Sequence, residues 1–160
     1  MGRMQIRRFR AGDAPALYEV FHSAIHLVAA RDYSAEQLAA WAPETPDLDA
    51  WVARMQDINP FVAELDGVIV GYADVQASGY IDHFYVSGRC PRQGIGGRLM
   101  QRLHEEARVL GCAELHSHVS LTAQPLFLRY GFTLVEQLRP VRRGVTFSNA
   151  LMRKRLEAGG

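Results

Sequence analysis

The strongest constraint on this chain is a strand, a turn rich in glycine and arginine, and a helix, which follow one another between Tyr80 and Gly111. Residues 80–86 are rich in aromatic and β-branched side chains, and this short run predicts a buried strand. Apolar residues then recur at helical spacing until Gly111, which is placed to end the helix. They are Leu99, Met100, Leu103, Ala107 and Leu110. The turn between strand and helix therefore leads directly into a helix N-terminus.

This turn has the composition of an anion-binding loop. Gly94, Gly96 and Gly97 carry no Cβ, so backbone N–H groups at the helix start can approach a ligand closely. The helix dipole adds partial positive charge there, which favours a phosphate. Full charges suited to a diphosphate come from three nearby arginines, Arg89, Arg92 and Arg98. The alternative is a glycine-rich turn that only lets the helix pack closely against a sheet.

The spacing of the glycines excludes two common phosphate loops. A Rossmann fingerprint requires a third glycine three residues after the second, and this chain has Leu99 at that place. A Walker loop requires Gly-Lys-Ser or Gly-Lys-Thr, and neither follows the glycines. The loop therefore belongs to neither class.

The run 92–99, preceded by Phe84-Tyr85-Val86, resembles the acetyl-CoA signature of the GCN5-related N-acetyltransferase (GNAT) family. In that family a Gln/Arg-x-x-Gly-x-Gly/Ala loop binds the CoA pyrophosphate. The opening position falls here on Pro91, which lacks an N–H donor, and Arg92 or Arg89 would have to compensate. Residues 120–132 resemble the family's C-terminal signature. The chain is most similar to small bacterial members with Ala-Trp-Ala at the end of the second helix.

Composition and length narrow the setting. The 160 residues, 48% of them hydrophobic, predict a single domain over 1–160 with a sizeable core. A formal charge of +1 argues against nucleic acid as a partner. No apolar run suggests a membrane span or a signal peptide. Cys90 and Cys112 show no metal or redox spacing, so we expect a reduced, cytoplasmic setting.

Periodicity predicts the order of helices and strands along the chain. Strands are expected at 4–10, 61–65, 68–75, 80–86, 114–119, 133–138 and 145–152, with helices between them. Asp66-Gly67 should form a tight hairpin turn, Asp13 should cap the first helix, and Ser34 with Gln37 should form a capping box for the second. The resemblance implies an α+β GNAT fold, a mixed and mostly antiparallel sheet of about seven strands flanked by helices. In that fold the strands ending at Val86 and Val119 splay apart and hold CoA.

The resemblance implies an acetyl-CoA-dependent N-acetyltransferase that acts on the amine of a small molecule or peptide, by direct attack in a ternary complex. Acetyl-CoA would be the acetyl-donor co-substrate. The alternative is a non-catalytic acyl-CoA-binding regulatory domain. Exposed edge strands leave room for a homodimer.

The same resemblance assigns residues to the cofactor. A backbone N–H between Phe84 and Val86 is expected to bind the developing oxyanion. The complete predicted set is Phe84, Tyr85, Val86, Arg89, Arg92, Gln93, Gly94, Ile95, Gly96, Gly97, Arg98, Ser120 and Phe127.

Acetyl transfer also requires a proton acceptor for the amine and a way to release the thiolate. Asp82 is the first candidate base, because Tyr80, Asp82 and Phe84 share one face of a regular strand. His83 points the other way and is the second candidate, and a water-mediated base is the remaining alternative. Many relatives carry a Tyr acid where this chain has Phe127, which leaves Tyr130 as the candidate acid. A thiol pKa of about 8.5 would also let the thiolate leave without one.

Candidate acceptor residues lie mainly in the first two helices. Tyr33, Trp41 and Trp51 are aromatic residues suited either to a pocket or to the core, and Tyr80 joins them from the fourth predicted strand. His22 and His26 lie one helical turn apart, a spacing that can bind a metal. No third ligand is visible nearby in the sequence, so we expect a solvated or substrate-facing pair and no metal.

Overall fold

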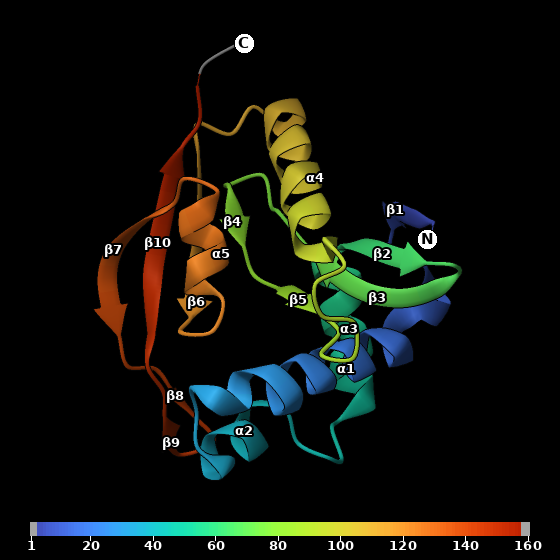
Figure 1. Ribbon diagram of the computed structural model, residues 1–160, viewed down its shortest axis with the longest axis vertical. Helices are drawn as coiled ribbons and strands as arrows, with labels where there is room; N and C mark the ends of the chain where they lie inside the picture. The colour runs from blue at the N-terminus through green and yellow to red at the C-terminus, as the bar shows by residue number, and fades with distance from the viewer. Residues whose placement is uncertain (1–2, 158–160) are drawn as a thin grey trace.

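The computed structural model describes residues 3–157, which form two four-stranded sheets and a small hairpin (Figure 1). The first sheet is antiparallel, in the order β1 (Met4–Arg8), β2 (Phe61–Leu65), β3 (Val68–Ala73) and β5 (Phe84–Val86). The second has the order β4 (Tyr80–Ile81), β6 (Glu114–Ser120), β10 (Asn149–Arg155) and β7 (Thr133–Leu138). Within it β4 is parallel to β6 and the other pairs are antiparallel. The hairpin pairs β8 (Val141–Arg142) with β9 (Val145–Thr146).

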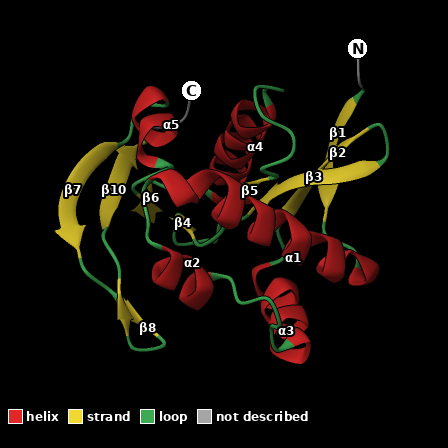
Figure 2. Cartoon of the chain, turned by 60° about the horizontal axis from the view of Figure 1, so that its bottom comes forward, coloured by secondary structure: helices red, strands yellow, loops and turns green. Residues whose placement is uncertain are grey.

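The chain has five α-helices within the described residues. They are α1 (Ala14–Ser23), α2 (Ala35–Trp41), α3 (Leu48–Ile58), α4 (Ile95–Leu110) and α5 (Gln124–Arg129). Of these, α1 and α4 pack on opposite faces of the first sheet. A short 3-10 turn, η1 (Ala11–Asp13), precedes α1, which continues without a break as the π-helix η2 (Ala24–Val28) and the 3-10 turn η3 (Ala29–Arg31). Figure 2 shows this continuous segment passing β5 and reaching α2. No helix within residues 3–157 combines the length and the apolar character needed to cross a bilayer.

Strand alternation divides the core into two layers. Phe61 and Ala63 of β2 face α4, whereas Val62 of β2 and Tyr72 of β3 face α1, α2 and α3. The layer under α4 continues across the second sheet through residues of β6, α5 and β10. The helix α4 therefore bridges the two sheets on one side.

The expected single strand at 80–86 was wrong in one respect, because it is divided into β4 and β5. The carboxylate of buried Asp74 accepts hydrogen bonds from the backbone N–H groups of Asp82 (3.0 Å) and His83 (2.6 Å). These two residues therefore belong to neither strand. The chain changes here from pairing with β6, through β4, to pairing with β3, through β5. The separation of β5 from β6 confirms the predicted splayed pair and the α+β fold class.

Three further expectations can be compared with the structure. The capping box of Ser34 and Gln37 is confirmed, with both reciprocal hydrogen bonds present. The expected strand at 145–152 is divided into β9 and β10, because the chain first closes the β8–β9 hairpin. The expected strand at 68–75 ends at Ala73, where Asp74 turns to bind the next segment.

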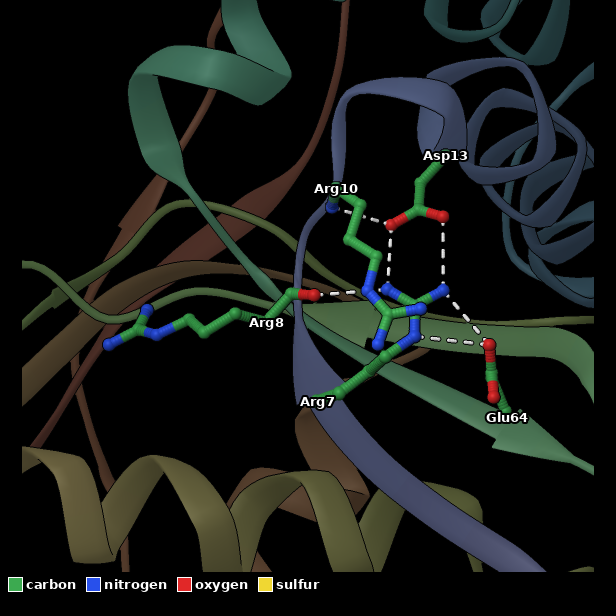
Figure 3. Close-up of polar contacts among 5 residues, drawn as sticks. All are labelled: Arg7, Arg8, Arg10, Asp13 and Glu64. Atoms are coloured by element: carbon green, nitrogen blue, oxygen red, sulfur yellow. Dashed lines mark hydrogen bonds and ion pairs between the residues drawn. The ribbon is translucent and has the colours of Figure 1, made fainter.

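The expected cap by Asp13 was wrong, because its carboxylate makes no side-chain cap bond to α1. It accepts two hydrogen bonds from the Arg7 guanidinium, at 2.8 and 3.0 Å, and one from the Arg10 backbone N–H (Figure 3). Arg7 also binds Glu64 on β2. Hydrogen bonding to Arg7 lowers the pKa of Asp13, and the same bond raises the pKa of Arg7. The carboxylate therefore fixes the start of α1 to the edge of the first sheet.

Candidate active site

Two adjoining cavities lie where β5 separates from β6. The larger cavity, of about 380 Å³, is bounded by η2, β5, the loop after β5, the start of α4 and α5. The smaller, of about 90 Å³, lies between β4, β6, the β8–β9 hairpin and α2. Residues common to the two linings mark where the cavities meet, and they are Trp41, Phe84, Tyr85, Ser120 and Ala123.

One edge of β5 carries backbone groups that face this junction. In the antiparallel pairing with β3, Asp74 N–H donates to His83 C=O, and Ser87 N–H donates to Val70 C=O. Hydrogen-bonded pairs alternate along an antiparallel ladder, so Phe84 and Val86 are the residues whose N–H and C=O groups point away from β3. Because β5 is the last strand of its sheet, those groups face the space between the sheets.

The start of α4 forms another wall of the larger cavity. Its N-cap, Gly94, has a φ of 75° and caps the helix with no side chain. The N–H groups of the first turn have no helical acceptor, which leaves them available to an anion. Gly96 serves packing as well, because a Cβ there would lie 3.3 Å from Leu126 Cδ2. Close packing is therefore shown at Gly96, and anion binding at the helix start stays a prediction.

The arginines around this loop divide by position. Arg92 lines the larger cavity, and Arg31 of η3 and Arg129 of α5 join it from elements distant in sequence. The side chains of Arg89 and Arg98 do not line it and are exposed. The arginines that line the cavity are therefore Arg31, Arg92 and Arg129, and the predicted roles of Arg89 and Arg98 stay predictions.

Most of the predicted cofactor residues line the larger cavity. They are Phe84, Tyr85, Val86, Arg92, Gln93, Gly94, Ile95, Gly96, Gly97 and Ser120. Phe127 lines the smaller cavity instead, where its ring contacts Phe84 edge to face with centroids 5.5 Å apart.

Asp82 lines the smaller cavity and forms an ion pair with Arg54 of α3. The side chain of Asp82 is 17% exposed, so the carboxylate lies at the cavity wall with limited access to water. Its backbone position is fixed by the hydrogen bond to Asp74. A carboxylate held in this way can accept a proton from a group inside the cavity.

His83 lies outside both linings, on the opposite side of the backbone from Asp82. Its Nδ1 shares a 3.0 Å hydrogen bond with the Tyr72 hydroxyl, and rings of Phe21 and Trp51 surround it. Burial lowers the pKa of His83 to about 3, with the positive charge of Arg54 as a smaller cause. The imidazole is therefore neutral at physiological pH and a weak base.

Asp74 is a functional candidate that the sequence reading missed. It is 1% exposed, and burial raises its pKa to about 6 against the opposing hydrogen bonds from His83 N–H and Gln76. Since its carboxylate makes the break between β4 and β5, it positions both Asp82 and the cleft-facing edge of β5. In the sequence, the feature that could have indicated this role is the position of Asp74 directly after the apolar strand β3.

Tyr130 lines neither cavity. Its hydroxyl lies 2.6 Å from where a Cβ on Gly97 would be, over the first turn of α4. The ring packs against the core layer under α4. The structure therefore places Tyr130 beside the cofactor loop and away from Asp82.

The candidate acceptor residues divide into two groups. Tyr33, Trp41 and Tyr80 line the smaller cavity. Of the two alternatives left open for Trp51, the structure shows the core, because its indole N–H donates to Ala14 C=O and its ring packs between Tyr18 and Phe21. The pair His22 and His26 lines neither cavity.

Two polar atoms at the smaller cavity have no hydrogen-bond partner within the described residues. They are Trp41 Nε1 and Asn149 Oδ1, both buried. The indole N–H lies near the Tyr85 hydroxyl without forming a well-directed bond, and burial raises the pKa of Tyr85 to about 12. Buried polar groups normally find partners, so this donor and this acceptor are suited to a ligand. Other lining residues that the sequence reading missed are Ser117, His118, Arg142 and Phe147.

A splayed strand pair with an uncapped glycine-rich helix start beside it is the architecture of the N-acetyltransferase class, whose acetyl donor is acetyl-CoA. Residues 29–156 match the acetyltransferase (GNAT) domain family. The chain therefore belongs to the GNAT family of N-acetyltransferases, which confirms the resemblance seen in the sequence.

Similar proteins agree with this assignment. The chain is 33% identical over 153 residues to the uncharacterized N-acetyltransferase YafP of Escherichia coli (strain K12), covering 96% of this chain and 97% of YafP. A GCN5-related N-acetyltransferase from Rhodopseudomonas palustris, also described as "Aminotransferase, Class-II", has a similar structure with a TM-score of 0.92 and 28% identity, covering 98% of each chain. A putative acetyltransferase from Salmonella typhimurium, yncA, solved with acetyl-CoA, shares the fold with a TM-score of 0.72 and 24% identity, over 99% of this chain and 96% of that one.

Proposed function

We propose that this protein binds acetyl-CoA in the larger cavity and transfers the acetyl group to an amine held in the smaller one, within a ternary complex. The observation that carries the proposal is the junction of the two cavities at β5. One cavity is bounded by a helix start and arginines, and the other by aromatic rings and a carboxylate. Two substrates of different chemistry would therefore meet at Phe84 and Tyr85. The acceptor is a small molecule or a peptide that carries an amine.

The larger cavity fits the CoA diphosphate and pantetheine arm. The free N–H groups of the first turn of α4 would bind the diphosphate, helped by Arg92 and Arg129. The polar edge of β5 would pair with the amides of the pantetheine as an additional strand does. Acetyl-CoA supplies the activated acetyl group, and the solved Salmonella relative with acetyl-CoA supports this choice.

The N–H groups of Phe84 and Val86 are the proposed donors to the thioester oxygen. Both point from β5 toward the cleft, and both belong to a strand held in place by β3. Because residues two apart on a strand are roughly 6.6 Å apart, one of the two would bind the thioester oxygen and the other would remain for the pantetheine. Donors fixed before the reaction stabilise charge that develops on the oxygen without reorganisation. The pairing register of β5 with β3 therefore leaves Phe84 and Val86 as candidate donors out of the predicted run from Phe84 to Val86.

Asp82 is the proposed proton acceptor for the amine, directly or through a water. Its carboxylate is at the wall of the smaller cavity, and Arg54 fixes its orientation. His83 ranks second, because its low pKa makes it a weak base and it lines neither cavity. Tyr130 ranks low as the acid, because it too lines neither cavity. Without an acid the thiolate would leave unprotonated and take its proton from solvent, which a thiol pKa of about 8.5 allows.

The test measures cofactor binding and turnover separately. Calorimetry with CoA and acetyl-CoA should show saturable binding, and a thiol-release assay with a panel of small amines and peptides should show amine-dependent turnover. Binding without turnover on any amine would favour a regulatory acyl-CoA-binding domain instead. Absence of heat with either form of CoA would contradict the proposal altogether.

A further inference from the structure

A cluster of two histidines and a glutamate lies outside both cavities, on the far side of α1 and η2. Ligand atoms of His22, His26 and Glu44 all lie within 4.8 Å of one another. The third group comes from the loop after α2 and is 18 residues or more from the histidines in sequence, so only the fold brings it there. We propose that this cluster binds a divalent transition metal, with Zn²⁺ as the best-matched ion. The inference does not depend on acetyl transfer.

The helix geometry aligns the two histidines. His22 is near the end of α1 and His26 is within the π-helix η2, so the two side chains lie about one helical turn apart on the same face. Their rings are stacked, with centroids 4.1 Å apart and planes at 24°. The ring nitrogens can therefore face the same point in space.

The protonation of His26 is fixed by its neighbour. Its Nε2 lies 2.7 Å from the Ala42 carbonyl oxygen. A carbonyl can only accept, so Nε2 carries the hydrogen and Nδ1 keeps its lone pair in the neutral ring. Metal-binding histidines commonly donate their second N–H to a backbone carbonyl, which orients the ring. The second shell of a metal site is thus already present.

The loop that carries Glu44 is held in place along the helix. Tyr18 O–H donates to the Pro43 carbonyl oxygen, and His22 Nε2 lies 2.8 Å from Glu44 Oε1. Together with the contact between His26 and Ala42, one helical face binds three consecutive loop residues. The cluster is therefore organised before any metal binds.

The ligand set and its access suit zinc. Zn²⁺ takes nitrogen and carboxylate ligands at roughly 2.0–2.2 Å, which places tetrahedral ligand atoms roughly 3.3–3.5 Å apart. Small rotations of the three side chains would reach that spacing from the present one. On binding, the metal replaces the proton that His22 Nε2 shares with the carboxylate, and the proton leaves to solvent or to Nδ1. The Glu44 side chain is 80% exposed, which leaves an entry path and room for a water as fourth ligand.

The alternative is a plain surface ion pair between His22 and Glu44, which would be worth little and would not require His26. The experiment separates the two. The full-length chain, stripped of metal with a chelator, is titrated with Zn²⁺ alone and with Co²⁺ alone, by calorimetry and by visible absorption. We expect about one Zn²⁺ per chain, competition between the two ions, and a metal-dependent rise in the melting temperature.

The variants H22A/H26A and E44A should lower Zn²⁺ affinity at least tenfold. The controls H104Q and E19A, at a histidine and an exposed carboxylate outside the cluster, should bind as the unsubstituted chain does. E44A changes a surface loop only, so it keeps the test decisive if the double variant fails to fold. Unchanged binding in E44A, loss of binding only in C90S/C112S, or no uptake by the unsubstituted chain would overturn the proposal.

Discussion

At the residue scale, the structure shows which arginines line the larger cavity, which the sequence pattern could not distinguish. The loop after β5 carries several arginines, but only Arg92 of these lines the larger cavity, and Arg129 joins it from α5. Arg98 is in the first turn of α4 and its side chain points away from the cavity into solvent. Charge near a glycine-rich loop is therefore not equivalent to charge at the binding surface.

The arginines give the first prediction. R92A and R129A should each weaken CoA binding by about tenfold, because each would lose a charge-assisted hydrogen bond to phosphate. R98A, the matched control in the adjoining first turn of α4, should change the dissociation constant less than about twofold. Calorimetric titration with CoA measures all three. Equal losses in R98A and R129A would show that the diphosphate binds elsewhere.

Asp82 gives the second prediction. D82N keeps the size of the side chain but removes the proton acceptor, so kcat/KM for the amine should fall by about 10²-fold with CoA affinity unchanged. The decrease should be smaller at high pH, where more of the amine is already neutral. R54M is the companion variant, because it leaves the carboxylate and removes only its ion-pair partner. Full activity in D82N would rule out this carboxylate and leave a water or His83 as the base.

Asp74 gives the third prediction, on stability. Burial raises its pKa from 3.8 to about 6. A carboxyl with a raised pKa favours the folded state while it is protonated, and this contribution is lost as the pH rises from about 4 through 6. D74N cannot ionise, so between pH 4 and 7 its free energy of unfolding should gain on the unsubstituted chain by about 2–3 kcal/mol. Urea unfolding at a series of pH values measures this, with D57N, at an exposed carboxylate, as control.

At the element scale, the functional geometry depends on how closely loops approach helices. The loop after β5 is held against α1 by a hydrogen bond of 3.0 Å from Gly88 N–H to the hydroxyl of buried Ser23. A Cβ on Gly88 would lie 2.4 Å from the Ser23 carbonyl oxygen. The path of the cofactor loop is therefore set by the absence of one side chain, at a glycine outside the recognised signature.

Gly88 gives the fourth prediction. G88A should destabilise the fold by about 1–3 kcal/mol, because the backbone oxygen it meets cannot move without shifting α1. It should also weaken CoA binding, since the loop would move away from η2. G12A is the control, because a Cβ there meets nothing within 4 Å. Chemical unfolding and CoA titration measure the two effects, and a G88A variant as stable as G12A would contradict the argument.

At the scale of the whole molecule, the proposed active site is the space between two sheets, and the chain crosses from one sheet to the other between β3 and β4, between β4 and β5, and between β5 and β6. The first sheet contributes the edge of β5, and the second contributes β6 and the α5 segment. The helix α4 bridges them on one side only. A ligand in the larger cavity would therefore contact both halves of the domain.

This arrangement gives the fifth prediction. Saturating acetyl-CoA should raise the melting temperature of the whole domain in one cooperative transition, by an amount that grows with the logarithm of its concentration. At 100 times the dissociation constant the added stability should be about 2.7 kcal/mol. Differential scanning calorimetry at several concentrations measures it, with adenosine alone as the control ligand. Two separate transitions would show that the sheets unfold independently.

The fold class, the glycine-rich helix start, the capping box of Ser34 and Gln37 and the family could all be predicted from the sequence. These features depend on local spacing and on the periodicity of apolar residues, which act over one or two elements. The division of the strand at 80–86 could not be predicted, because it depends on the carboxylate of Asp74, directly after β3, which binds the backbone of that segment in the folded chain. The same holds for Arg31 and Arg129 at the cavity, and for Glu44 beside the two histidines. These groups are distant along the chain, and the packing of helices onto sheets brings them together.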